Sequence, residues 1–190
     1  MLNPDLLRSF FDAGLSYDRY VATGTPDQQV SWKTATQRVV LIEPQRSLVA
    51  SFTRRVHVLV LSGTWCGDCV HQVPMIAALA SINPNVLSLR LVDRDKAIEL
   101  SNHVKICGGN RVPTALFLNE DYEFLSIYGD KSLSRLRAQA AKSIGASCMI
   151  PSVGIGVDEA ASTLQDWANE FERAHLIARL SSKLRQRHGD

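Results

Sequence analysis

The stretch VHVLVL at residues 56–61, followed after three residues by WCGDC at residues 65–69, decides the fold of this chain. An uninterrupted apolar run over residues 58–61 is typical of a buried strand. Ser62-Gly63-Thr64 turns the chain, and a helix is predicted to begin at or near Cys66. Apolar residues then recur at helical spacing on one face: Val70, Val73, Ala77 and Ala80.

This context predicts that Cys66 and Cys69 form a redox pair. Free backbone N–H groups and the dipole at a helix N-terminus favour a thiolate at Cys66, and the thiolate is the attacking species in disulfide exchange. Cys69 lies one turn further along the helix, close enough to attack a mixed disulfide formed at Cys66. No bound cofactor is needed, since the dithiol carries the two electrons.

Two other interpretations of the cysteine pair remain open. A CxxC pair can be half of a zinc site, but such a site needs a second, similarly spaced pair. Cys107 and Cys148 are isolated, and His71 is the only other nearby candidate ligand, so we expect no metal. The pair can also be retained on a redox fold that no longer turns over.

Composition places the chain among ordinary globular proteins. It has 190 residues, 45% hydrophobic and 21% charged residues, and a net charge of +2, which gives no argument for nucleic acid. No apolar run approaches the ~20 residues of a membrane span, so no membrane association is expected. The first residues lack a secretory pattern, and four cysteines do not suggest a disulfide-stapled framework. A cytoplasmic location is therefore predicted.

Residues 1–53 are predicted to be helical. Asn3 with Pro4, and Thr25 with Pro26, are typical of a helix cap followed by proline in the first turn. Pro44 is expected to interrupt the helical pattern. A packing stripe is expected along the helix that precedes it, through Trp32, Ala35, Val39 and Ile42.

Residues 54–140 alternate between strand and helix patterns. Strands are predicted at 86–92, 114–118 and 122–128, with the first of them parallel to 56–61 and the last two forming an antiparallel hairpin. Asp93 or Asp95 is expected to cap the helix that reaches about residue 104. Asp130 is expected to cap the next helix, whose inward side chains are predicted to be Leu133 and Leu136.

The last fifty residues begin with glycine and proline breaks at 145 and 151–156, which do not form a phosphate-binding loop. One long helix is predicted from about 158 to 187. Its apolar stripe consists of Leu164, Trp167, Phe171, Ala174, Ile177 or Ala178, and Leu184. Its basic end is interpreted as a solvated face.

Four features together resemble the thioredoxin superfamily: the WCGDC motif, Pro74 five residues after it, Arg111-Val112-Pro113-Thr114, and Gly129. The resemblance implies an α/β, thioredoxin-like fold, with a central mixed sheet flanked by helices. The core would span 54–140, with helical extensions at 1–53 and 141–190. The family also implies a cis peptide bond at Pro113, which exposes the backbone of Val112 for pairing with a bound polypeptide.

The chain also departs from the family pattern. Thioredoxins place a buried aspartate six residues before the first cysteine, where this chain has Val60. Asp68 replaces the proline between the cysteines. Its carboxylate can act as a base or can disfavour a neighbouring thiolate. Cys107 lies in a glycine-rich loop before Pro113, and it is interpreted as a third redox thiol or as an idle cysteine.

The predicted function is thiol–disulfide oxidoreduction on protein or peptide disulfides. Cys66 attacks and Cys69 resolves, while an external thiol reductant or reductase restores the dithiol. Docking the substrate, or tuning the reactivity of the cysteine pair, is assigned to five neighbouring residues: Trp65, Gly67, Asp68, Val112 and Pro113. A redox sensor and a non-catalytic thioredoxin-like binding module are the alternative functions.

Overall fold

The structure is a computed structural model that describes residues 2–144 and 158–190. Within these ranges, four strands form one mixed sheet in the order β2-β1-β3-β4. The strands are β1 (Val56–Ser62), β2 (Leu87–Asp93), β3 (Thr114–Leu118) and β4 (Phe124–Gly129). As the sequence predicts, β1 pairs in parallel with β2, and β3 and β4 form an antiparallel hairpin. β1 also pairs antiparallel with β3.

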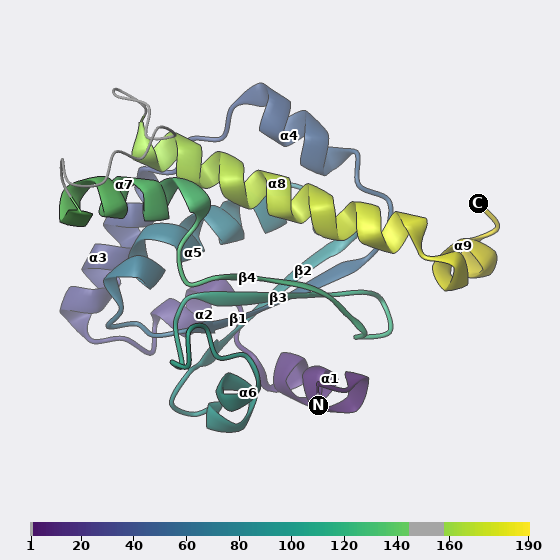
Figure 1. Cartoon of the computed structure of the whole chain (residues 1–190), viewed down its shortest axis with the longest axis horizontal. Helices are drawn as coiled ribbons and strands as arrows, with labels where there is room; N and C mark the ends of the chain where they lie inside the picture. Colours follow the sequence, from purple (N-terminus) through teal and green to yellow (C-terminus); the bar gives the residue numbers. More distant parts are fainter. Residues whose placement is uncertain (1, 145–157) are drawn as a thin grey trace.

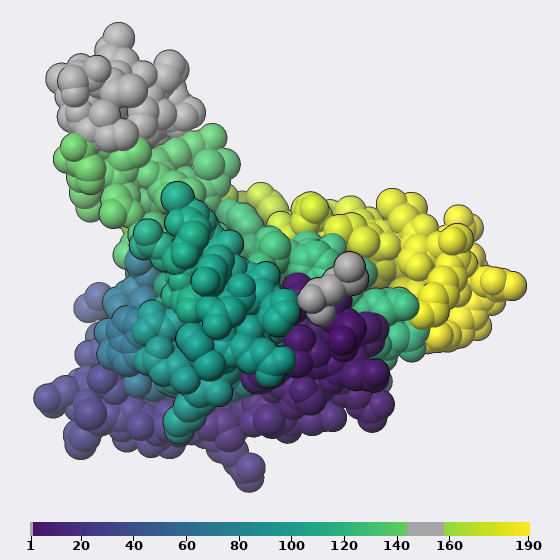
Figure 2. Space-filling model, turned by 60° about the horizontal axis from the view of Figure 1, so that its bottom comes forward, coloured from purple at the N-terminus to yellow at the C-terminus, as the bar shows by residue number. Residues whose placement is uncertain are grey.

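Helices cover both faces of this sheet (Figure 1). The redox helix α5 (Gly67–Ala80) and the long α8 (Glu159–Leu180) lie over one face. α1 (Pro4–Ala13) and α6 (Ile98–His103) lie on the other. The space-filling view shows the N-terminal segment and the α6 region side by side (Figure 2), consistent with the shared pocket that Leu2 and His103 line. The expected α/β, thioredoxin-like arrangement with additional terminal helices is confirmed.

The N-terminal helices are α1, α2 (Tyr17–Val21), α3 (Pro26–Gln37) and α4 (Glu43–Ala50). The two predicted caps are present: Asn3 Oδ1 accepts from the Leu6 N–H at 2.8 Å, and Thr25 belongs to a capping box. The apolar stripe is wrong beyond Ala35, because α3 ends at Gln37 and Ile42 is 53% exposed. Pro44 lies in the first turn of α4, where a missing N–H does no harm, so it begins a helix instead of interrupting one.

Two predictions in the middle of the chain are corrected. Neither Asp93 nor Asp95 caps α6, whose N-cap is Ala97. The Asp93 carboxylate accepts from the Asp95 and Lys96 N–H groups in the turn before the helix. In α7 (Leu133–Ile144), Leu133 and Leu136 are about half exposed instead of facing inward.

The start of α7 explains the second error. Buried Ser132, not Asp130, lies at the helix start, and its hydroxyl accepts from the Arg135 N–H at 3.3 Å. Because α7 starts at this point, the Arg135 side chain points toward α5, where it hydrogen-bonds Asp68. The two leucines therefore point outward.

The predicted C-terminal helix is two helices. α8 begins after its Asp158 cap and ends at Leu180, and α9 (Ser182–His188) starts after Ser181, whose hydroxyl accepts from the Leu184 N–H. The apolar stripe is confirmed, with Ala178 buried at the position left open. The breaks predicted at 145 and 151–156 lie outside the described residues. No helix in the described parts of the chain is long and apolar enough to cross a bilayer.

Candidate active site

The redox motif lies at the C-terminal end of β1, where the chain enters α5. Cys66 is the N-cap of this helix, and its Sγ accepts from the Cys69 N–H at 3.4 Å. The cap position places the sulfur at the unsatisfied N–H groups of the first turn, which favour a negative charge. The helix predicted from the apolar spacing therefore begins where the sequence places it.

The two sulfurs differ in exposure and in acidity. The Cys66 pKa is lowered to about 6, first by the hydrogen bond from the Cys69 thiol and then by the backbone N–H groups of Cys69 and Asp68. Cys69 is fully buried, and burial raises its pKa well above the ordinary value. At neutral pH these shifts favour the thiolate at Cys66 and the thiol at Cys69, and the attacking and resolving roles stay predictions.

A second loop closes over Cys66 from β3. The Val112–Pro113 peptide bond is cis, as the resemblance implies, and the Val112 carbonyl lies 3.5 Å from Cys66 Sγ. Gly129 supports this loop from β4. Its φ is +146°, and an added Cβ would lie 2.2 Å from the Pro113 carbonyl oxygen, so a side chain does not fit.

Trp65 and Gly67 form the exposed surface around Cys66. The Trp65 indole is 51% exposed, and the Arg94 guanidinium lies over its ring at 4.6 Å from the centroid. Gly63 packs against the same ring, while Gly67 has open space where a side chain would be. The residues predicted to dock a substrate thus border the half-buried Cys66 sulfur.

Asp68 is held by two cations, one just before α7 and one in its first turn. Arg135 Nε donates to Asp68 Oδ1 at 2.6 Å, and Lys131 Nζ lies 3.2 Å from Oδ2. Burial alone would raise the Asp68 pKa, but Arg135 and then Lys131 outweigh it and the pKa is lowered. Asp68 is therefore an anion at neutral pH and a poor proton acceptor.

The N-terminal helices also reach the motif. The Trp32 indole is fully buried, and its Nε1 donates to the Thr64 carbonyl at 2.9 Å, two residues before Cys66. Sequence reasoning missed Arg135 and Lys131, and treated Trp32 only as a core or edge residue. No spacing pattern links positions 32, 131 and 135 to the motif, so only the fold reveals these contacts.

Cys107, a further candidate, takes part in none of the contacts described above. Cys107 is exposed, has a φ of +48°, and sits in a tight turn closed by hydrogen bonds between Ile106 and Gly109. Its role as a third thiol stays a prediction, and Cys148 lies outside the described residues. Across residues 2–144 and 158–190, no group of three His, Cys, Asp or Glu side chains could hold a metal ion.

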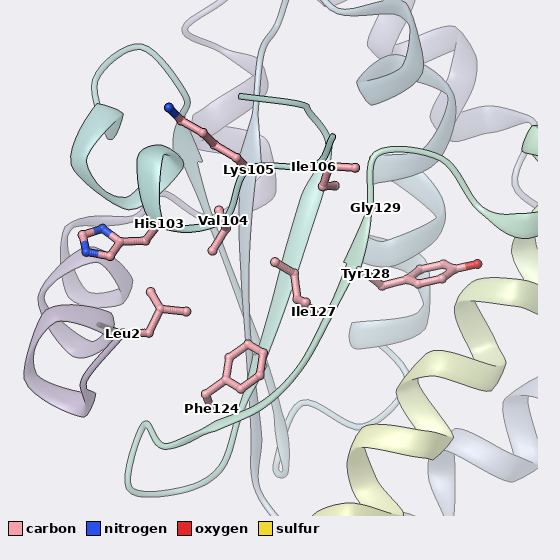
Figure 3. Close-up of a pocket in the computed structure, with 9 residues that line it drawn as sticks. All are labelled: Leu2, His103, Val104, Lys105, Ile106, Phe124, Ile127, Tyr128 and Gly129. Atoms are coloured by element: carbon pink, nitrogen blue, oxygen red, sulfur yellow. The ribbon is translucent and has the colours of Figure 1, made fainter. Parts of the chain in front are cut away.

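A separate apolar pocket lies along the edge strand β4 (Figure 3). Phe124 and Ile127 point into it, whereas Tyr128 points toward α8, where its ring meets Trp167 at 5.0 Å. Leu2 and the segment from His103 to Ile106 form its other wall. This pocket contains neither redox cysteine and none of the docking residues predicted from the sequence.

Comparisons with known proteins agree with this geometry. A family model described as thioredoxin matches residues 14–135. A Pseudomonas aeruginosa protein of unknown function is similar in structure, with TM-score 0.67 and 18% identity, over 87% of this chain and 93% of its own. An HIV epitope scaffold aligns with TM-score 0.62 and 18% identity, over 92% and 98%. At this identity, the two structures show the fold alone. Among curated proteins, none matches the chain.

Proposed function

The chain belongs to the thioredoxin superfamily, and from this we propose that it is a thiol–disulfide oxidoreductase acting on protein or peptide disulfides. One observation carries the proposal: a half-buried Cys66, whose pKa is lowered to about 6, lies directly beside a fully buried Cys69. This asymmetry is what two-step disulfide exchange requires, because the first sulfur must attack and the second must wait.

The proposed reaction begins at the surface around Trp65. A substrate disulfide approaches Cys66, and the backbone of Val112 before Pro113 pairs with the bound polypeptide. The Cys66 thiolate attacks one substrate sulfur, the substrate S–S bond breaks, and the other substrate sulfur leaves and takes up a proton. Cys69 then attacks Cys66, which releases the second substrate thiol and leaves a Cys66–Cys69 disulfide.

An external dithiol or reductase must then return two electrons to the protein. The cytoplasm, where thiol reductants are abundant, is the proposed compartment. Asp68 adjusts the pKa of Cys66. Its negative charge disfavours the Cys66 thiolate, and Arg135 and Lys131 partly balance the Asp68 charge. Gly67 leaves the approach to Cys66 open.

A redox sensor is the second candidate function, and one contact favours it. The Trp32–Thr64 hydrogen bond connects the N-terminal helices to the loop that carries Cys66. If oxidation of Cys66 and Cys69 moves that loop, the Trp32–Thr64 hydrogen bond would pass the movement to α3. Such a protein would alter its protease sensitivity when Cys66 and Cys69 join, whereas a simple reductase would change little.

The test is dithiothreitol-driven reduction of a model protein disulfide by the wild type, Cys66→Ser and Cys69→Ser. We expect Cys66→Ser to fall to the uncatalysed rate, and Cys69→Ser to accumulate a mixed disulfide at Cys66. Cys107→Ser tests the third thiol in the same assay: an unchanged rate would identify it as idle, and a slower rate would identify it as a participant in the exchange. A wild-type rate no higher than that of Cys66→Ser would contradict the proposal and favour a sensor or a non-catalytic binding module.

A further inference from the structure

The surface around Cys66 comes from two loops that are distant in the sequence. Trp65 belongs to the motif loop after β1, whereas Val112 belongs to the loop that ends at cis-Pro113. The Trp65 indole is 51% exposed. A side chain with half of its surface in water can occupy several rotamers, so a fixed docking surface needs a contact that holds the indole in one of them.

Arg94 is the residue that touches both loops, and its backbone is fixed first. It directly follows β2, and its N–H donates to the carbonyl of Ser62, the last residue of β1, at 2.9 Å. This hydrogen bond extends the parallel pairing of β1 with β2 beyond the last paired residues. The Arg94 backbone is therefore tied to the strand that carries the motif loop.

The Arg94 guanidinium then makes three contacts at once. It lies over the Trp65 ring at 4.6 Å from the centroid, and its Nη1 donates to the Asn110 carbonyl at 3.4 Å, two residues before Val112. Its Nε and Nη2 lie 2.9 and 2.8 Å from one carboxylate oxygen of Asp95. A guanidinium is planar and carries five N–H donors, so it can stack on an indole and donate in its own plane at the same time.

The indole is also in contact with the backbone of its own loop. A Cβ added at Gly63 would lie 2.7 Å from Trp65 Cε2, so the ring lies against the glycine and leaves no room for a side chain there. The Trp65 ring thus touches the motif loop and Arg94, while half of its surface stays open to a substrate.

We propose that Arg94 is a positioning residue of the redox site: it holds the Trp65 indole and the loop before cis-Pro113 in one arrangement, as a preformed docking surface for a disulfide-bearing polypeptide. The inference deepens the proposed function and rests on it. Arg94 acts through Trp65 and Asn110, not on the reacting sulfurs. Apparent affinity falls in proportion to the population of the binding-competent arrangement, so Arg94 lowers the substrate concentration that the reaction needs.

Trp65 fluorescence measures this arrangement directly. Of the chain's three tryptophans, Trp65 is exposed, whereas Trp32 and Trp167 are fully buried. Time-resolved fluorescence anisotropy of the reduced protein should show a fast component in Arg94→Gln that is much weaker in the wild type, because a freed exposed side chain changes rotamer within nanoseconds. Equal fast components in the two proteins would overturn the inference.

A single-turnover experiment measures the consequence for docking. Pre-reduced protein is mixed with an excess of a synthetic peptide closed by one disulfide, and rapid quenching with an alkylating reagent follows formation of the Cys66–Cys69 disulfide. Arg94→Gln should raise the half-saturating peptide concentration about threefold, the size of one exposed cation–π contact, and should change the maximal rate less. Hydroxyethyl disulfide, which has no polypeptide to dock, should show a smaller loss. An unchanged half-saturating concentration for the peptide would overturn the inference.

Arg94→Lys separates positioning from charge. Lysine keeps the positive charge but lacks the planar fork, so Arg94→Lys should remain close to Arg94→Gln in both measurements. Full recovery of the wild-type values in Arg94→Lys would show that charge alone acts, and would overturn the positioning role.

Arg8→Gln is the matched control. Arg8 also lies over an aromatic ring, that of Tyr122 at 5.5 Å, and also pairs with an aspartate, Asp12. Tyr122 lies in the turn between β3 and β4, at the opposite end of β3 from cis-Pro113, so Arg8→Gln should match the wild type. A rise in Arg8→Gln as large as that in Arg94→Gln would overturn the inference.

The two proposals fail in different ways. A wild type that forms no Cys66–Cys69 disulfide with either substrate would overturn the proposed function. The anisotropy of Trp65 would still test whether Arg94 holds the indole, because it needs no substrate.

Discussion

Two aspartates at opposite ends of the sheet are each held by one arginine and one lysine. Beside the redox motif, Asp68 lies 2.6 Å from Arg135 and 3.2 Å from Lys131. In the β3–β4 turn, Asp121 lies 2.9 Å from Arg187 and 2.8 Å from Lys183 of α9. The two sets contain the same types of charged group.

The surroundings of the two sets differ. The Lys131 side chain is 15% exposed, whereas that of Lys183 is 51% exposed. Burial opposes the ionisation of Asp68, and its pKa falls despite that opposition. For Asp121, the hydrogen bonds from Arg187 and Lys183 are larger causes than burial, and its pKa reaches about 2. The comparison teaches that a strongly lowered pKa does not mark the important ion pair; burial and the neighbouring thiolate do.

The largest effect is expected from Asp68→Asn. The change removes the carboxylate that Arg135 and the mostly buried Lys131 share, so that, among the described residues, Arg135 keeps only Glu159 and Lys131 keeps only Asp130 as an ion-pair partner. Losing hydrogen bonds to charged groups costs about 1–3 kcal/mol of unfolding free energy. Urea denaturation of the reduced protein measures it. Asp121→Asn is the matched control and should lose clearly less. Equal losses in the two variants would remove the distinction between the two sets.

The sequence predicted one member of each set but not the connections between them. Asp68 stood out because it lies between the cysteines, and Asp121 lies in the short connection between the two strands predicted to form a hairpin. The cations escaped because each contact depends on where a helix begins. Ser132 sets the start of α7 and so turns Arg135 toward Asp68, and Ser181 separates α9 from α8. The solvated-face interpretation of the basic end missed the pairing of Arg187 with Asp121.

The strands and the cysteine pair were more predictable, because their signals are local. An apolar run followed by CxxC specifies a buried strand, a turn and a helix cap within fifteen residues of chain. Trp32 carries no such signal, because an aromatic residue on a helix most often belongs to the core. Its hydrogen bond to the Thr64 carbonyl arises only when α3 packs against α5.

A smaller effect is expected on the acidity of Cys66. The wild-type thiol should alkylate with a pH midpoint of about 6, with full reactivity above it and loss below it as the sulfur gains a proton. The Asp68 charge raises the Cys66 pKa, so Asp68→Asn should move the midpoint to lower pH, and Asp121→Asn should leave it in place. Iodoacetamide kinetics across pH 4–9 provide the measurement, and Cys66→Ser reports the alkylation of the other thiols, such as the exposed Cys107. A midpoint that moves upward in Asp68→Asn would show that Arg135 and Lys131 act differently from simple counter-charges.

The smallest effect is expected at the β3–β4 turn. The Asp121 pKa of about 2 lies below its ordinary 3.8, first because Arg187 and then because Lys183 hydrogen-bonds the charged form. The folded state therefore gains stability from this carboxylate above about pH 4, and loses it as the pH falls through 2. Both cations are exposed, so 1 M salt, with a Debye length of about 3 Å, should remove most of the benefit. The thermal midpoint of Asp121→Asn should then fall slightly below that of wild type in low salt at pH 7 and match it in 1 M NaCl or near pH 2. A difference that persists in 1 M NaCl would mean that α9 is held to the turn by a buried contact, and the two sets would then resemble each other more than their exposure implies.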